Sequence, residues 1–103
     1  MNYAVRWQQS AKDDVTEIEF WYVLNASWEI AIKVGDRIRD QVNSLEMFAM
    51  RTRPSRQEGF RELVITGAPY IAYIFVEGET VIVAGVFHTA RDFPPDELLS
   101  RMN

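Results

Sequence analysis

Four arginines lie close together in residues 51–61 and are the strongest candidates for chemistry in this sequence. They are Arg51, Arg53, Arg56 and Arg61. Only Glu58 opposes them, so the segment has a net charge of +3 (four arginines minus one glutamate), whereas the whole chain has −4. Because a guanidinium group is a planar, two-pronged donor, the cluster suits an anion, either RNA phosphate or a carboxylate-rich partner surface. The alternative is an exposed loop that arginines keep soluble.

His88 is the only histidine and stands at the end of a long apolar run. It either has a structural role through hydrogen bonds or acts as a general acid or base with help from neighbouring charges such as Arg91. Since the chain has no cysteine and no second histidine, we expect no metal site. The sequence contains no glycine-rich phosphate loop, serine nucleophile elbow or zinc-protease motif, and we expect no cofactor.

Length and composition bound the class of protein. With 103 residues, 48% of them hydrophobic, the chain suffices for one packed core but not for two. The net charge of −4 argues against a protein that coats nucleic acid, because phosphate binding depends on many lysines and arginines. The first ten residues are too polar for a signal peptide, and no apolar run approaches the roughly 20 residues of a membrane span. We expect a single domain over residues 1–103, located in the cytoplasm.

The amino-terminal half predicts a strand followed by two helices. Alternation over 3–7 indicates the strand, and Ser10 is a candidate N-cap for a helix over 11–24, with Asp14 near its positive end. A second, longer helix begins at Ser27. Its apolar seam steps by three and four residues through Trp28, Ala31, Gly35, Ile38, Val42, Leu45 and Ala49.

Two small residues in that seam, Ala31 and Gly35, allow another helix to approach closely. The connection between the two helices is short, so we expect them to pack together as an antiparallel hairpin. The hairpin region also holds more large aromatic side chains than a core of this size can hide, and we expect some to stay exposed for a partner. These are Trp7, Phe20, Trp21, Tyr22 and Trp28.

The carboxy-terminal half predicts a loop over 51–59 and then three strands joined by short turns. The strands are expected over 61–66, 70–76 and Thr80–His88. The last is continuously apolar from Val81 to Phe87 and should either be covered on both faces or lie centrally in the sheet. A short helix follows Pro94. The order β-α-α-β-β-β predicts an α+β fold, in which a helical hairpin packs on a three-stranded antiparallel meander.

Several strings in this order carry a family resemblance. They are RELV at 61–64, GAPY at 67–70 and HTARDFP at 88–94, together with the strand that ends at Trp7 and the spacing of Ala11, Asp14 and Ile18. The chain resembles the ParE/RelE superfamily of bacterial toxins, and most of all its ParE branch, whose members are often labelled plasmid stabilisation proteins. The resemblance covers nearly the whole chain.

The resemblance implies a small toxin of a type II toxin-antitoxin system, neutralised by a cognate antitoxin in a hetero-oligomer. ParE-like members inhibit DNA gyrase, whereas RelE-like members cut mRNA on the ribosome. The tail contains no tyrosine after Tyr73, and the only lysines, Lys12 and Lys33, lie on the predicted helices. A ribosome-directed nuclease normally needs a broad basic face. We therefore favour the gyrase inhibitor, with an endoribonuclease as the alternative and a member that only binds as a third reading.

Each reading assigns roles to particular residues. For the favoured reading we expect the target to contact Arg61, Arg91, Asp92 and Phe93, and the antitoxin to contact Trp21, Trp28, Arg51 and Arg53, with no catalytic residues. For the endoribonuclease, the catalytic set would be Arg56, Arg61, His88 and Arg91.

Overall fold

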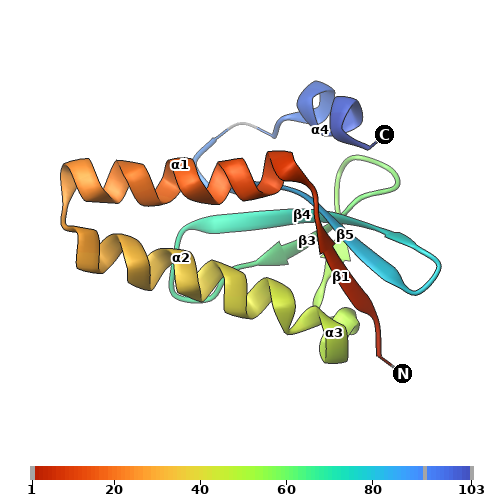
Figure 1. Cartoon of the computed structure of the whole chain (residues 1–103). Coiled ribbons are helices and arrows are strands. Elements are labelled where there is room, and N and C mark those ends of the chain that lie inside the picture. The colour runs from red at the N-terminus through yellow and green to blue at the C-terminus, as the bar shows by residue number, and fades with distance from the viewer. Residues whose placement is uncertain (1, 92, 103) are drawn as a thin grey trace.

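A mixed sheet of five strands lies between helices in the computed structural model, which describes residues 2–91 and 93–102 (Figure 1). The strands are β1 (Ala4–Trp7), β2 (Arg53–Pro54), β3 (Arg61–Val64), β4 (Tyr70–Glu77) and β5 (Thr80–His88). Their order in the sheet is β1-β5-β4-β3-β2, with β1 parallel to β5 and every other pair antiparallel.

The predicted α+β class is confirmed, but the predicted sheet was wrong in extent. β3, β4 and β5 pair in chain order as expected, yet they are the middle of a five-stranded mixed sheet and not a separate three-stranded meander. The first strand joins β5 in parallel, and β2 arises within the segment expected to be a loop. Both additions depend on pairing between residues far apart in sequence, which local periodicity does not report.

The helices are α1 (Gln9–Asn25), α2 (Trp28–Asn43), α3 (Leu45–Phe48) and α4 (Pro95–Arg101), with a 3-10 turn over Ala49–Arg51. The second helix begins at Ser27 as predicted, and Ser27 is its N-cap, since its hydroxyl oxygen accepts a hydrogen bond from Ile30 N–H at 3.2 Å. The second helix was predicted to continue through Ala49, but α2 ends at Asn43 and the chain restarts as α3. The described helices include none with the length and apolarity needed to cross a membrane.

Two hydrophobic clusters form, one on each face of the sheet. On one face α1 and α2 pack against the strands through Ala11, Val15, Ile38 and Val42. On the opposite face, the fully buried side chain of Leu98 from α4 covers a mainly aromatic cluster. Its other buried members are Phe60, Tyr73, Phe75, Ile82, Ala84 and Phe87. The first of the two placements predicted for the last strand, coverage on both faces, is therefore confirmed.

The close approach of α1 and α2 depends on Gly35, as the small-residue seam predicted. Gly35 and Ala31 are both buried at the contact. A Cβ at Gly35 would overlap the carboxylate of Glu19 and lie 2.9 Å from Nη1 of Arg39. Those two side chains form a two-pronged pair, each N···O distance being 2.9 Å, so the glycine makes room for an ion pair between the helices.

β5 carries one extra residue near its middle. Tyr73 pairs with Gly85 whereas Ile74 pairs with Val83, so Ala84 is left over as a β-bulge. The register with β1 reaches only as far as Val83. Beyond the bulge, the outer edge of β5 therefore has no neighbouring strand among the described residues.

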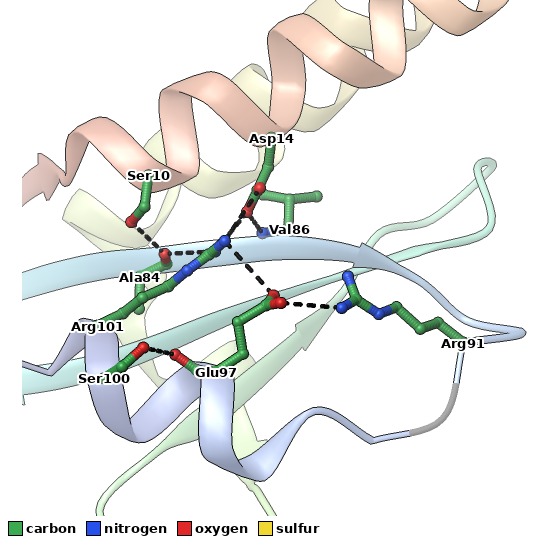
Figure 2. A network of polar contacts seen from close by, with 8 residues as sticks. All are labelled: Ser10, Asp14, Ala84, Val86, Arg91, Glu97, Ser100 and Arg101. Carbon is green, nitrogen blue, oxygen red and sulfur yellow. Dashed lines mark hydrogen bonds and ion pairs between the residues drawn. The ribbon is translucent and has the colours of Figure 1, made fainter.

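Side chains take the place of a strand at that edge (Figure 2). The carbonyl of Ala84 accepts hydrogen bonds from Ser10 Oγ at 2.9 Å and from Arg101 Nη1 at 3.2 Å. Val86 N–H donates to Asp14 Oδ2 at 3.0 Å, and the same oxygen lies 2.7 Å from Arg101 Nη1. The network joins α1, β5 and α4, and it holds the carboxy-terminal helix on the sheet.

Two predictions about the start of the first helix were therefore wrong. The N-cap position is Gln8, which makes no side-chain capping bond, and the first turn contains no acidic residue. Ser10 and Asp14 lie within α1 and point to the bulge of β5, where backbone groups without a strand neighbour need other hydrogen-bond partners.

Candidate functional site

A cavity of about 290 Å³ lies where β2, β3 and β4 meet the segment after β5. Its charged and aromatic lining residues are Arg53, Arg56, Glu62, Tyr73, His88, Arg91 and Phe93. We call this the arginine pocket. It brings together Arg53, Arg56, His88, Arg91 and Phe93, which the sequence had assigned to three different roles.

Aromatic rings hold two of the guanidinium groups in place. The Arg56 guanidinium lies 4.6 Å from the centre of the Phe93 ring, and that of Arg91 lies 4.7 Å from the centre of the Phe87 ring. Stacking of this kind attracts the cation and leaves its N–H groups free around the rim. The pocket thus presents preoriented donors.

The pocket retains one net positive charge among the described residues. Arg53 Nε lies 3.1 Å from Glu62 Oε1, and Arg91 Nη2 lies 3.0 Å from Glu97 Oε1. Arg56 has no carboxylate within ion-pair distance in the described parts of the chain. Among the described side chains, three arginines therefore face two carboxylates, and the guanidinium of Arg56 is the one without a described counterion.

Tyr73 forms the buried floor of the pocket, and its exposed fraction is only 5%. Burial raises the pKa of its hydroxyl above the ordinary value, and the nearby carboxylate of Glu62 raises this pKa further, against the opposing effect of Arg56 and Arg53. The hydroxyl is therefore neutral at physiological pH, where it can donate a hydrogen bond but does not act as a base.

His88 is exposed and is held in one orientation. Its ring packs edge-on against Tyr70 with the ring centres 5.3 Å apart, and its Nδ1 accepts a hydrogen bond from Ala90 N–H at 3.0 Å. Because Nδ1 accepts, the neutral ring carries its proton on Nε2. This geometry favours a structural role at the strand end and presents Nε2 as a donor.

Three residues that the sequence predicted for the functional site do not line the arginine pocket or lie outside the described residues. Arg61 faces away from the pocket, where it donates to Thr52 Oγ1 at 2.7 Å and to the Thr52 carbonyl at 2.9 Å. Arg51 lies on the 3-10 turn and donates to Ser44 Oγ at 3.3 Å. Asp92 lies outside the described residues.

A second, larger hollow of about 750 Å³ runs between α1 and the end of β5. Its apolar wall comes from Phe20, Trp21 and Leu24, whose side chains are 63%, 57% and 69% exposed. We call this the apolar groove. Of the two tryptophans predicted to contact an antitoxin, Trp21 lies in the groove, whereas Trp28 is exposed at the start of α2, outside it.

The arginine pocket and the apolar groove share a wall. His88 and Arg91 line both of them. The sequence pattern did not predict this shared wall or the contributions of Glu62 and Tyr73 to the arginine pocket. For Glu62 a signal existed, because a glutamate next to Arg61 in an otherwise apolar strand is a candidate partner for a second arginine.

The sheet does not offer a broad basic surface in the described parts of the chain. The face opposite the helical hairpin is covered by α4 and by Phe60, so Phe75, Ile82 and Phe87 are buried. The described residues contain no group of three or more acidic or histidine side chains that could hold a metal ion. The arrangement can bind an anion and an apolar surface at adjoining sites.

Comparison with known proteins identifies relatives of this fold. The family model described as ParE toxin of type II toxin-antitoxin system, parDE, matches residues 5–93. A solved chain from the chromosomal ParDE toxin-antitoxin system of P. aeruginosa superposes with a TM-score of 0.79 at 27% identity, over 84% of this chain and 95% of that one. No curated protein matches the sequence.

The fold is also similar, more distantly, to that of a chain from a RelBE toxin-antitoxin complex. A chain from the RelBE2 toxin-antitoxin complex of Mycobacterium tuberculosis superposes with a TM-score of 0.57 at 20% identity, over 88% of this chain and 95% of that one. At this identity the likeness concerns the fold alone.

Proposed function

Because this chain belongs to the ParE toxin family of type II toxin-antitoxin systems, we propose that it inhibits DNA gyrase, and so DNA replication, until a cognate antitoxin binds it. The resemblance noted in the sequence motifs is thereby confirmed at the level of the family. The target, the antitoxin and the residues that contact them belong to the proposal, as do a cytoplasmic location and a role in plasmid stabilisation.

The observation that carries the choice of target is the covered sheet face. Cleavage of RNA by its 2′-hydroxyl needs a base, an acid and cations for the developing charge, and binding to the ribosome calls for a wide basic surface. Here α4 lies over the face where such a surface would be, and the cations are confined to the arginine pocket. A protein that acts by binding fits these features better than a nuclease does.

The apolar groove supports the proposal of an antitoxin partner. Large exposed apolar side chains concentrated on one surface are typical of a protein interaction site. Phe20, Trp21 and Leu24 provide such a surface on α1. The solved relative from P. aeruginosa is described as a ParDE toxin-antitoxin system, which supports a partner of the same kind for this chain.

One observation favours the alternative of a ribosome-dependent endoribonuclease. Three of its four candidate catalytic residues, Arg56, His88 and Arg91, line the same pocket. Against it, Nδ1 of His88 accepts from Ala90 N–H, no carboxylate among the described residues contacts the ring, and Tyr73 is buried in its neutral form.

Expression of the chain alone in bacteria separates the two proposals. A gyrase inhibitor should stop incorporation of labelled thymidine before incorporation of labelled methionine changes. Arrest of methionine incorporation first would contradict the gyrase proposal and support the nuclease. Co-expression of the cognate antitoxin should restore growth in either case.

A further inference from the structure

A single aromatic ring near the end of β5 contacts two guanidinium groups. The guanidinium carbon of Arg91 lies 4.7 Å from the centre of the Phe87 ring, and that of Arg101 lies 5.1 Å from it. Two cations on one ring repel each other, and an anion between them offsets this repulsion. The carboxylate of Glu97 is that anion, since its Oε1 lies 3.0 Å from Arg91 Nη2 and its Oε2 lies 3.5 Å from Arg101 Nη2. One carboxylate of α4 thus bridges the two arginines (Figure 2).

The two arginines differ in their other partners. Arg101 also lies 2.7 Å from Asp14 and donates to the Ala84 carbonyl at 3.2 Å. The side chain of Arg91 is 49% exposed, and Glu97 is its one ion-pair partner among the described residues. Loss of the Glu97 charge would therefore leave Arg101 in place and release Arg91.

Arg91 lies where its orientation matters for binding. It lines both the arginine pocket and the apolar groove, at the wall that the two share. A long, half-exposed side chain loses conformational freedom when a partner fixes it, which costs binding free energy, and a side chain that is already held avoids this cost. The bridge to Glu97 and the stacking on Phe87 hold Arg91 in this way before any partner arrives.

Stability of the fold does not account for the bridge between Arg91 and Glu97. An ion pair between half-exposed side chains contributes little to folding, because water screens the charges and both side chains lose freedom. Other contacts hold α4 over the sheet, namely the burial of Leu98 and the shielded pair between Arg101 and Asp14. The Glu97 carboxylate therefore determines the position of Arg91 more than the stability of the protein.

We propose that Glu97 is a positioning residue, which holds Arg91 in the orientation that the target contacts. This inference rests on the proposed function, in which Arg91 is a contact to the target. It adds that the carboxy-terminal helix contributes to inhibition by fixing Arg91.

Chemical labelling tests the bridge in the absence of any target. Phenylglyoxal condenses with accessible guanidinium groups, and mass spectrometry of proteolytic peptides gives the rate at each arginine. Glu97→Gln should label Arg91 about three times faster than wild type, the factor that corresponds to loss of a half-exposed ion pair. The rate at Arg101 should not change, because Asp14 still holds it.

Asp96→Asn is the matched control for the labelling. Asp96 lies beside Glu97 in the first turn of α4, has the same charge, and forms no ion pair among the described residues. Its labelling rates should equal those of wild type. An unchanged rate at Arg91 in Glu97→Gln would overturn the proposal. A joint rise at Arg91 and Arg101 would overturn it too, because it would mean that Glu97 holds α4 as a whole.

A double-mutant cycle on gyrase inhibition tests the consequence for function. Glu97→Gln should raise the protein concentration needed for inhibition about threefold in the wild-type background. It should have no effect in the Arg91→Gln background, where no guanidinium is left to position. The melting temperature of Glu97→Gln should match that of wild type. Equal effects of Glu97→Gln on inhibition in both backgrounds would overturn the positioning role. Absence of any gyrase inhibition by wild type would instead refute the proposed function, and the labelling would still decide whether Glu97 holds Arg91.

Discussion

The carboxylate of Asp14 in α1 lies 2.7 Å from the guanidinium of Arg101 at the end of α4 (Figure 2). The side chains are 11% and 18% exposed, so the pair is largely shielded from water. Asp14 also accepts the backbone N–H of Val86, and Arg101 also pairs with Glu97 at 3.5 Å. Together with the burial of Leu98, this contact keeps α4 over the sheet face opposite the helical hairpin.

Removal of the Asp14 charge should therefore loosen the carboxy-terminal helix. Asp14→Asn leaves Arg101 without its nearest anion, and we expect the free energy of unfolding to fall by about 2 kcal/mol in urea denaturation. Asp13→Asn is the matched control, because Asp13 is exposed and its one hydrogen-bond partner among the described residues is Gln9. Its effect should stay within about 0.5 kcal/mol. Equal losses in the two variants would show that the Asp14–Arg101 pair does not stabilise the fold.

The effect of Gly35→Ala on the free energy of unfolding should depend on the residue at position 19, being a loss with glutamate there and a gain with alanine. In wild type the added methyl displaces the Glu19 carboxylate from Arg39, and we expect a loss of about 1 kcal/mol in the free energy of unfolding. In Glu19→Ala the carboxylate is gone and the Arg39 side chain, released from its ion pair, can swing aside, so the better helix propensity of alanine should stabilise α2 by up to about 1 kcal/mol. Chemical denaturation of the four proteins measures both effects. A loss of the same size in both backgrounds would place the conflict somewhere other than Glu19.

Alkaline pH should destabilise the protein through its buried tyrosines. Burial raises the pKa of Tyr73 and, with a hydrogen bond to Tyr22, that of Tyr70 above the ordinary value near 10. Above about pH 10 the unfolded chain loses these protons while the folded protein keeps them, so stability is complete below that pH and falls as pH rises. Denaturation curves of wild type and Tyr73→Phe over this range check the effect. The phenylalanine variant should lose stability less steeply, and an unchanged slope would contradict the burial argument.

Arg56→Gln should raise the protein concentration needed to inhibit gyrase by about tenfold. The substitution removes the cation of the arginine pocket that no described carboxylate neutralises. The exposed loop position predicts an unchanged melting temperature. Lys33→Gln has the same change in charge and should inhibit like wild type. Full potency of Arg56→Gln would remove the arginine pocket from the target surface.

Local patterns in the sequence predicted much of the fold and part of the site. The start of the second helix at Ser27 and the burial of Ala31, Gly35, Ile38 and Val42 follow from residues within a few positions of each other. The buried strand Thr80–His88 was predicted with its exact bounds. Such features depend on short-range periodicity, which a single sequence displays.

Features that depend on distant residues escaped prediction. The parallel pairing of β1 with β5, the bulge at Ala84 and the reach of Arg101 to Asp14 each join segments far apart in the chain. Gly85 belongs to the same group, because a Cβ there would lie 2.5 Å from Arg101 Nη1. The arginine pocket was predicted in part. The cluster of arginines in residues 51–61 indicated an anion-binding site, whereas Glu62 and Tyr73 have the pattern of ordinary strand residues and were not assigned to it.

Purified protein assayed in parallel on gyrase and on mRNA-programmed ribosomes tests the proposed function most directly. We predict that it stops DNA supercoiling by gyrase at concentrations that leave the ribosome-bound mRNA intact, and that His88→Ala does not alter this. Cleavage of the mRNA that is lost in His88→Ala, with gyrase still active, would contradict the account and establish the endoribonuclease.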